Sequence, residues 1–227
     1  MSRIEALQEC YYNKRAAEYD DSANYQREEF AAIMAPVRAR YQLALQGRDV
    51  LEIACGPGYW TEAVAVTAHS ILATDLDPGL VSMVRNRLAG VSSVRCEVAS
   101  AYTLEGVSGR FDAAFAQFWW SHMPHSRIRS FLTTLHGRLL PGSTVMFLDS
   151  LPRSFGGRWL DDNGDLIEER RLRNGTRFEI IKNLPTKREM MAALDGIAEE
   201  IDYKQFRADG YWTVSYRTKG PSLAQDH

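Results

Sequence analysis

The chain contains 227 residues, of which 45% are hydrophobic and 25% are charged. This composition predicts a globular protein with one hydrophobic core, and it excludes a disordered chain. The formal net charge of −2 gives no overall positive field that would attract nucleic acid. The sequence contains no run of about 18 apolar residues, so it predicts no membrane-spanning helix. We therefore expect a single domain over residues 1–227 that has neither a nucleic acid nor a membrane as its partner.

The cysteines indicate a reducing compartment. Cys10, Cys55 and Cys96 are odd in number and lack the spacing of metal ligands, so we expect free thiols and no metal site. The first residues mix charged and polar side chains with short apolar stretches, which is unlike a signal peptide. A cytoplasmic location is the expectation.

Periodic patterns predict the elements in chain order. Residues 3–20 and 25–46 have helical patterns, and Pro36 marks a potential break in the second. Strands and helices then alternate, which predicts a parallel sheet with right-handed crossovers. The predicted strands are 49–54, 70–74, 93–98, 111–119 and 144–149, with helices at 60–68, at 126–140 and in the stretch that ends at Leu88.

The pattern changes after Asp149. Strands at 168–173 and 177–182 flank Asn174-Gly175, which is typical of a two-residue type I′ hairpin. In that register Arg170 would pair with Glu179, and Lys182 with Ile167. A helix at 186–194 and strands at 199–206 and 211–217 follow, so we expect seven strands in the main sheet and a hairpin insertion over residues 151–185.

The segment from Leu51 to Thr61 indicates a ligand site. A buried strand ends at Gly56 and Gly58, where the chain can turn sharply and a ligand can approach the backbone without meeting a Cβ. Asp75 ends the next strand, the position of a ribose-binding carboxylate in nucleotide-binding sheets. A dinucleotide site would have a third small residue where Thr61 stands, whereas Glu52 suits the ammonium group of S-adenosylmethionine (SAM).

Four segments resemble the class I SAM-dependent methyltransferases. Glu52 to Gly58 resembles their first motif, 73–77 the ribose motif, 111–124 the strand-four motif, and 140–142 the turn before strand five. The resemblance covers roughly residues 10–217. It implies a Rossmann-like α/β fold with a mostly parallel seven-stranded sheet, helices on both faces, and SAM as the cofactor.

One position departs from the pattern of this class. Ser100 stands where the third motif usually carries an acid that contacts adenine, so the Ser100 hydroxyl and a backbone amide near Ala101 would replace it. The predicted cofactor-binding residues lie on the first helix, the glycine loop and the strand ends: Tyr12, Arg15, Tyr19, Glu52, Gly56, Gly58, Trp60, Thr61, Asp75, Leu76, Ser100, Ala101 and Gln117.

A narrower resemblance concerns the substrate. Segments 11–20, 58–61, 119–124 and 170–182 are similar to the phosphonate O-methyltransferases of dehydrophos biosynthesis. This implies that an anionic group is surrounded by Tyr25, His122, Arg170 and Lys182, under a lid formed by residues 1–46.

Simpler interpretations of these residues remain open. His122 taken alone could be a core histidine, and Arg170 and Lys182 could be solvated charges of a hairpin. Trp119 and Trp120 are adjacent on a predicted strand, so one of them is expected to face the site.

We therefore expect O-methylation of a small acidic metabolite such as a phosphonate, phosphate or carboxylate, in secondary metabolism. An anionic oxygen needs orientation by basic side chains rather than a general base. The alternatives are N- or O-methylation of a planar aromatic metabolite, for which His122 is the candidate base, and SAM binding without catalysis. The expected partner is a small-molecule substrate, with the protein a monomer or homodimer.

Overall fold

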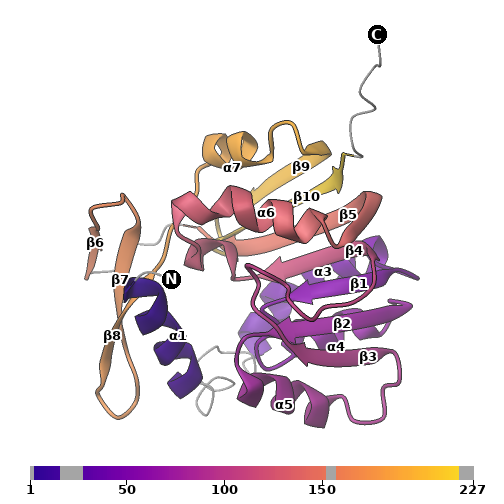
Figure 1. Ribbon diagram of the computed structural model, residues 1–227, viewed down its shortest axis with the longest axis horizontal. Helices are drawn as coiled ribbons and strands as arrows, with labels where there is room; N and C mark the ends of the chain where they lie inside the picture. Colours follow the sequence, from indigo (N-terminus) through magenta and orange to yellow (C-terminus); the bar gives the residue numbers. More distant parts are fainter. Residues whose placement is uncertain (1–2, 16–27, 152–156, 220–227) are drawn as a thin grey trace.

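A seven-stranded sheet forms the centre of the protein in the computed structural model, which describes residues 3–15, 28–151 and 157–219. Its strands follow the spatial order β3-β2-β1-β4-β5-β10-β9, and only β10 runs antiparallel to its neighbours (Figure 1). This is the mostly parallel sheet that the alternating pattern predicted. The strands are β1 (Asp49–Ile53), β2 (Ser70–Asp75), β3 (Val94–Val98), β4 (Phe111–Gln117), β5 (Leu139–Ser150), β9 (Ala198–Phe206) and β10 (Tyr211–Thr218).

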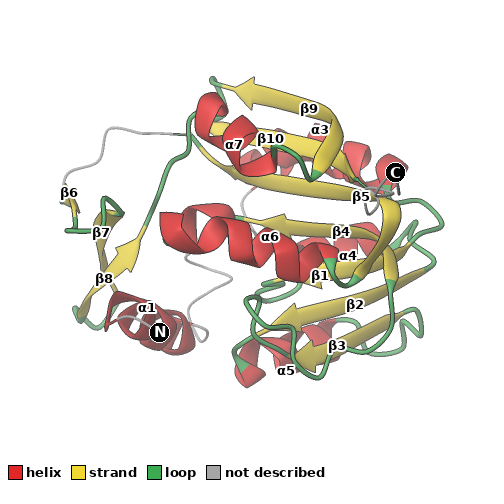
Figure 2. Ribbon diagram, turned by 45° about the horizontal axis from the view of Figure 1, so that its top comes forward, coloured by secondary structure: helices red, strands yellow, loops and turns green. Residues whose placement is uncertain are grey.

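Helices cover both faces of this sheet (Figure 2). Because successive side chains of a strand point to opposite faces, β1 sends Leu51 and Ile53 into one core and Val50 into the other. The first core contains α6 (Ile128–His136) and α7 (Lys187–Leu194). The second contains α3 (Glu28–Ala44), α4 (Tyr59–Ala65) and α5 (Pro78–Arg87).

A separate antiparallel sheet lies beyond the carboxyl end of β5. It consists of β6 (Arg158–Leu160), β7 (Leu166–Arg171) and β8 (Arg177–Ile181). Helix α1 (Arg3–Arg15) packs along β8, and Tyr11 meets Phe178 with ring centroids 5.6 Å apart (Figure 1). The insertion after strand five is therefore a three-stranded sheet, with the first helix of the chain packed against it.

The predicted register of the hairpin was wrong by one residue. Arg170 lies opposite Phe178, and Ile167 opposite Ile181, because the loop has three residues instead of two. Leu172 donates its N–H to the Thr176 carbonyl (2.9 Å) and closes this loop, in which Gly175 takes a φ of 85°. A three-residue hairpin needs one residue in the left-handed region, and glycine meets that need at little cost.

Other predicted boundaries also shifted. Pro36 lies inside a continuous α3, because Met34, Val37 and Tyr41 hold the helix against the sheet although one backbone hydrogen bond is missing. The predicted helix over 126–140 begins as a 3-10 turn and becomes α-helical at Ile128. Strand β6 was not predicted, and residues 16–20 and 25–27 of the predicted helices lie outside the described residues. No helix in the described ranges is long and apolar enough to cross a membrane.

Asn183, directly after β8, joins the small sheet to the large one. Its side-chain amide donates to the Met123 carbonyl (2.8 Å) and to Asp165 Oδ1 (2.7 Å), and its side-chain oxygen accepts from the Leu166 N–H (2.7 Å). The residue is only 2% exposed. Because Met123 and Asp165 are buried, losing the amide would leave buried polar groups without hydrogen bonds.

We predict that Asn183→Ala lowers the free energy of unfolding by about 2–4 kcal/mol, since it leaves several buried polar groups unpaired. Urea denaturation followed by circular dichroism measures this change. Asn86→Ala, at an exposed position of α5, is the matched control and should change stability by less than about 0.5 kcal/mol. Equal effects of the two substitutions would contradict this role for Asn183.

Candidate functional site

A cavity of about 360 Å³ opens at the carboxyl ends of the parallel strands. Ala54 and Gly56 follow β1, Asp75 and Leu76 lie at the end of β2, and Gln117 ends β4. Helix α1 forms another part of the wall. Open parallel sheets bind ligands at this edge, and the volume is that of a small-molecule site. The remaining lining residues are Glu5, Gln8, Glu9, Tyr12, Asn13, Asp77, Leu80, Ala99, Ser100, Ala101, Tyr102, Thr103, Phe118, Trp119, His122 and Arg127.

The glycine loop between β1 and α4 is held by Asp75. Asp75 Oδ2 accepts the Gly56 N–H (2.9 Å), and its Oδ1 accepts the Asp77 N–H (3.0 Å). Gly58 has a φ of 89°, and a Cβ placed on it would lie 3.0 Å from Val84 Cγ2. Glycine is therefore required at Gly58 by its backbone conformation and by the packing of α5. Any larger residue would disturb the loop itself as well as a ligand.

Acidic side chains outnumber basic ones along the described part of the cavity wall. Glu5, Glu9, Asp75 and Asp77 line it, whereas Arg127 is the one Lys or Arg there. Arg127 is paired with Glu5 (2.8 Å) and lies 3.7 Å from the centre of the Tyr102 ring. The wall therefore favours a cationic ligand such as a sulfonium with an ammonium group, and it disfavours the pyrophosphate of a dinucleotide.

Polar atoms without partners mark the inner wall. Gln117 Nε2 and Trp119 Nε1 are buried and have no hydrogen-bond partner among the described residues, although both side chains line the cavity. Glu52 Oε2, behind the wall, is likewise buried without a partner. Buried polar atoms are almost always paired in native proteins, so these three indicate a polar ligand or bound water. The wall thus fits a ligand with an amino-acid end, as SAM has.

Burial raises the pKa of the Glu52 carboxyl to about 8, with the Thr61 hydroxyl opposing the rise and the charge of Asp75 adding to it. In the ligand-free protein Glu52 therefore holds a proton at neutral pH. An ammonium group nearby would favour the ionised carboxylate.

The predicted cofactor residues fall into three groups. Seven of them line the cavity: Tyr12, Gly56, Asp75, Leu76, Ser100, Ala101 and Gln117. Five do not, and these are Arg15, Glu52, Gly58, Trp60 and Thr61. Tyr19 lies outside the described residues, as does Tyr25 of the predicted substrate site.

The five residues away from the wall have local reasons for their positions. The Trp60 ring packs 5.5 Å from that of Tyr41 between α4 and α3, and Thr61 is completely buried under the loop. Arg15 lies over the Tyr11 ring at 5.8 Å. Ser100, by contrast, lines the cavity. Its hydroxyl accepts the Tyr102 N–H (3.3 Å), so part of its hydrogen-bonding capacity is used within its own turn.

His122 lies on the cavity wall in the 3-10 turn after β4. Its Nδ1 is 2.9 Å from the Ile181 carbonyl, and its Nε2 is 2.9 Å from the Tyr12 hydroxyl. A carbonyl can only accept, so Nδ1 carries the proton and Nε2 accepts from Tyr12. Burial lowers the pKa of His122 well below 6.5, and the charges of Lys182 and Arg170 lower it further. His122 is therefore neutral at physiological pH.

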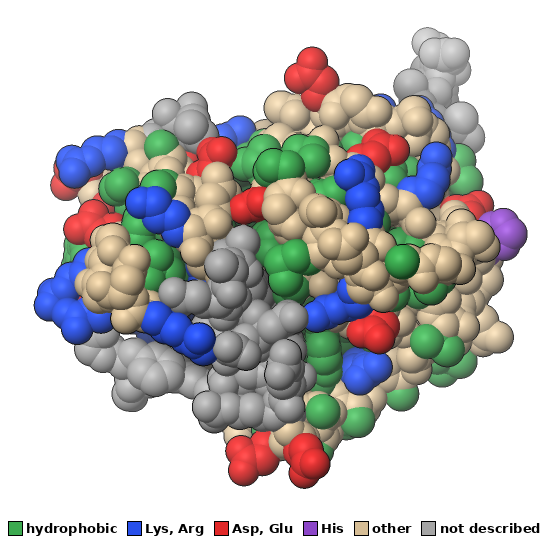
Figure 3. Space-filling model, turned by 90° about the horizontal axis from the view of Figure 1, so that it is seen from below, with side chains coloured by type: hydrophobic (Ala, Val, Ile, Leu, Met, Phe, Trp, Pro, Cys, Tyr) green, Lys and Arg blue, Asp and Glu red, His purple; other side chains and the backbone are tan. Residues whose placement is uncertain are grey.

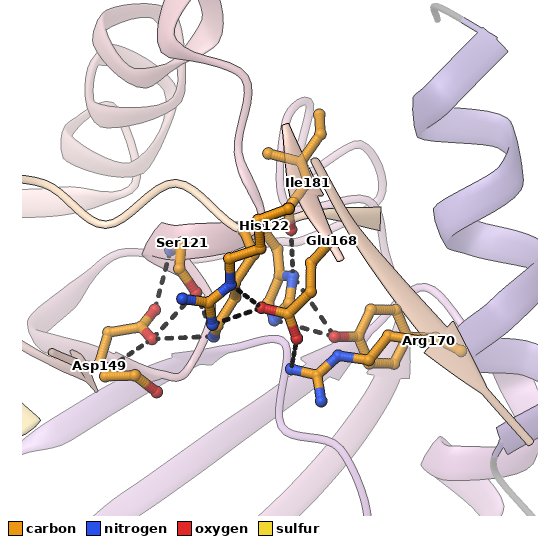
Figure 4. A network of polar contacts seen from close by, with 10 residues as sticks. Ser121, His122, Asp149, Glu168, Arg170 and Ile181 are labelled. Carbon is orange, nitrogen blue, oxygen red and sulfur yellow. Dashed lines mark hydrogen bonds and ion pairs between the residues drawn. The ribbon is translucent and has the colours of Figure 1, made fainter. Parts of the chain in front are cut away.

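Neither predicted hairpin cation lines the cavity, but the charges of both act on His122. Figure 4 shows Arg170 in the same polar network as His122. Lys182 donates to the Ser121 hydroxyl (2.7 Å) and lies 3.4 Å from Asp149. Arg170 pairs with the buried Glu168 (2.7 Å), two residues before it on the same face of β7. This pairing replaces the predicted one with Glu179, because the register differs by one residue.

Trp119 and Trp120 point to different surroundings, although the predicted reason was wrong, because β4 ends at Gln117 and both residues lie beyond the strand. Trp119 lines the cavity, whereas Trp120 is 1% exposed and packs on Phe147 and Trp212. Sequence reasoning missed the α1 residues Gln8 and Asn13 and the basic Arg127 as parts of the wall. The pattern of α1 alone gave no signal for them, since polar residues on a helix usually face solvent.

Three comparisons with known proteins agree with this geometry. Residues 50–142 match the family described as a methyltransferase domain. Over 129 residues the chain is 31% identical to the ubiquinone biosynthesis O-methyltransferase of Xanthomonas campestris pv. campestris. That alignment covers 52% of this chain and 51% of the relative, so the chain spans about half the length of the curated relatives it matches.

Solved structures share the fold over nearly the whole chain. A complex of DhpI with SAH has a TM-score of 0.76 at 23% identity and covers 97% of this chain and 100% of its own. CalS10 of Micromonospora echinaspora, an amino pentose methyltransferase solved with SAM, has a TM-score of 0.60 at 18% identity, covering 89% and 96%. The sheet order and the likeness to these solved structures show the Rossmann-like fold of the class I methyltransferases, and residues 50–142 match a methyltransferase domain. The predicted fold is confirmed.

We predict that Asp75→Ala weakens SAM binding by about 1–3 kcal/mol, because the Gly56 amide loses its partner and the ligand loses a carboxylate. Isothermal titration calorimetry with SAM and S-adenosylhomocysteine measures the change. Asp162→Ala, at an exposed position, is the control. Unchanged affinity in a folded Asp75→Ala protein would contradict the assignment of this loop.

A second prediction concerns the pH dependence of stability. Because the folded-state pKa of Glu52 is about 8 and the usual value is 4.5, the folded protein binds this proton more tightly. The resulting stabilisation is complete below pH 4.5 and is lost as the pH rises to about 8. Relative to Glu52→Gln, the ligand-free parent should lose about 3–5 kcal/mol across this window in urea denaturation. Parallel curves for the two proteins would show that Glu52 ionises normally.

Proposed function

We propose that the protein transfers the methyl group of SAM to an oxygen of a small acidic molecule that binds beside His122. The observation that carries this proposal is the charge around the hairpin end of the cavity. Arg158 and Arg170 pair there with Glu168, and Lys182 pairs with Asp149. Figure 4 shows Arg170, Glu168 and Asp149 in one polar network. Among these five side chains the positive charges exceed the negative ones. An anion that entered next to His122 would therefore be stabilised.

The two hairpin cations would act differently. The Lys182 side chain is 8% exposed and bonded to Ser121, so its charge would act through space. The Arg170 side chain is 41% exposed, and its partner Glu168 is also held by Arg158 (2.6 Å). Arg170 can therefore turn toward an anionic substrate while Glu168 remains paired. We assign Arg170 to direct contact with the acid and Lys182 to the local field.

When bound, SAM supplies an electrophilic methyl group, and the protein's task is to orient an oxygen toward it. The glycine loop, Asp75 and Gln117 would hold the cofactor at the strand ends. Glu52, behind this wall, would act on the ammonium group through its charge. The Nε2 lone pair of the neutral His122 is taken by the Tyr12 hydroxyl. An ionised acceptor oxygen needs no base, only alignment and exclusion of water. Tyr19 and Tyr25, predicted to complete the site, lie outside the described residues.

The distribution of charged side chains on the surface also supports a small-molecule substrate. On the face shown in Figure 3, Lys and Arg side chains lie beside Asp and Glu side chains, and no extended patch of one sign is visible. Binding to the phosphate backbone of nucleic acid depends on clustered positive charge. We therefore propose a small-molecule partner. The chain is similar in structure to DhpI, solved in complex with SAM and HEP. It is similar in sequence to the ubiquinone biosynthesis O-methyltransferase, which supports transfer to oxygen.

We predict that Arg170→Ala raises KM for an acidic acceptor at least about tenfold, some 1.4 kcal/mol, and leaves the SAM affinity unchanged. The measurement is transfer of a labelled methyl group to a panel of phosphonates, carboxylic acids and phenols. Arg173→Ala, in the exposed hairpin turn, is the matched control and should behave like the parent.

The panel also separates the alternatives. Transfer to phenols alone, with Arg170→Ala and Arg173→Ala behaving alike, would favour a planar aromatic substrate. SAM binding without transfer to any acceptor would favour a non-catalytic protein.

A further inference from the structure

Gln8 is a buried polar residue on the side of α1 that faces the hairpin. It is 7% exposed, and it lines the cavity together with Tyr12, one helical turn further on. Residues four apart on a helix share a face, so both side chains reach the same region. A buried glutamine side chain requires specific hydrogen-bond partners for its amide.

Gln8 completes a closed ring of three hydrogen bonds. Its Oε1 accepts the Ile181 N–H (2.9 Å), and its Nε2 donates to the His122 carbonyl (2.9 Å). The third bond runs from His122 Nδ1 to the Ile181 carbonyl (2.9 Å). The ring therefore joins three segments that are remote in sequence: α1, the 3-10 turn after β4, and β8.

The geometry of the small sheet explains why the N–H and C=O of Ile181 bond to Gln8 and His122 rather than to β7. The Lys182 N–H donates to the Leu166 carbonyl (2.7 Å), so the neighbouring Ile181 is the residue whose N–H and C=O point away from β7. These groups at the edge of β8 need partners because Ile181 is completely buried. Gln8 satisfies the N–H, and the His122 ring satisfies the carbonyl.

We propose that Gln8 is a positioning residue, which fixes the His122 imidazole as the Nδ1–H tautomer and holds Tyr12 against Nε2. It does so by locking both the His122 backbone and the Ile181 peptide group to α1. The lone pair of Nε2 then faces the Tyr12 hydroxyl at the cavity wall. The consequence for methyl transfer rests on the proposed function, whereas the consequence for the His122 tautomer does not.

The test uses Gln8→Met, which keeps the length and approximate volume of the side chain but removes both hydrogen bonds. Ala6→Gln, at an exposed position of the same helix, is the control. In ¹⁵N-histidine-labelled protein, the parent should show His122 protonated at Nδ1 alone from about pH 7 to 8, since its pKa is lowered below 6.5. A His122→Gln spectrum assigns the signals.

In Gln8→Met we expect a mixture of His122 tautomers or a titration within that range, and a fall in kcat of about tenfold or more. SAM affinity should stay within about threefold of the parent. A parent-like His122 spectrum in Gln8→Met would overturn the proposal, because Gln8 would then only fill space. Ala6→Gln should match the parent in every measurement.

If Gln8→Met does not fold, Gln8→Glu replaces it. The carboxylate still accepts from Ile181 but cannot donate to the His122 carbonyl, so it should disturb the His122 spectrum, and a parent-like spectrum would again refute the proposal. A parent protein that methylates no acceptor would refute the proposed function alone. The comparison of spectra would still decide the role of Gln8.

Discussion

The site depends on the buried contact between the small sheet and the end of β4. Lys182, at the end of β8, is held by Ser121 and Asp149, and Asn183 fixes the next turn to Met123. Burial lowers the pKa of the Lys182 ammonium, while Asp149 opposes this effect. Breaking such a buried pair is costly because it leaves an uncompensated charge. His122 lies directly after Ser121, so this contact also places the imidazole.

The two ends of the cavity differ in charge, and the difference suits methyl transfer. Carboxylates surround the end formed by the glycine loop and α5, where a cationic cofactor would bind. Basic side chains gather behind His122, where an acidic acceptor would bind. This difference in charge along the cavity would orient the cofactor and the acceptor before either forms a specific contact. The neutral imidazole between them avoids placing one more positive charge beside the hairpin cations.

Helix α1 connects both ends. Glu9 and Asn13 face the cofactor region, whereas Gln8 and Tyr12 contact the hairpin and His122. The position of α1 comes both from the apolar packing of Tyr11 against Phe178 and from the polar contacts of Gln8 and Tyr12. Movements of α1 would therefore change cofactor enclosure and the surroundings of His122 together.

The sequence alone determined the order of the elements and the cofactor edge. Buried strands appear in the sequence as short apolar runs, and Gly56 and Asp75, which follow or end such runs, line the cavity as predicted. Boundaries moved by a few residues, because packing held α3 together through Pro36. Only the tertiary structure decided the partners of Lys182, Arg170 and Gln8. Those partners are remote in sequence, and a shift of one residue in a hairpin changes which side chains face each other, so no local pattern could supply them.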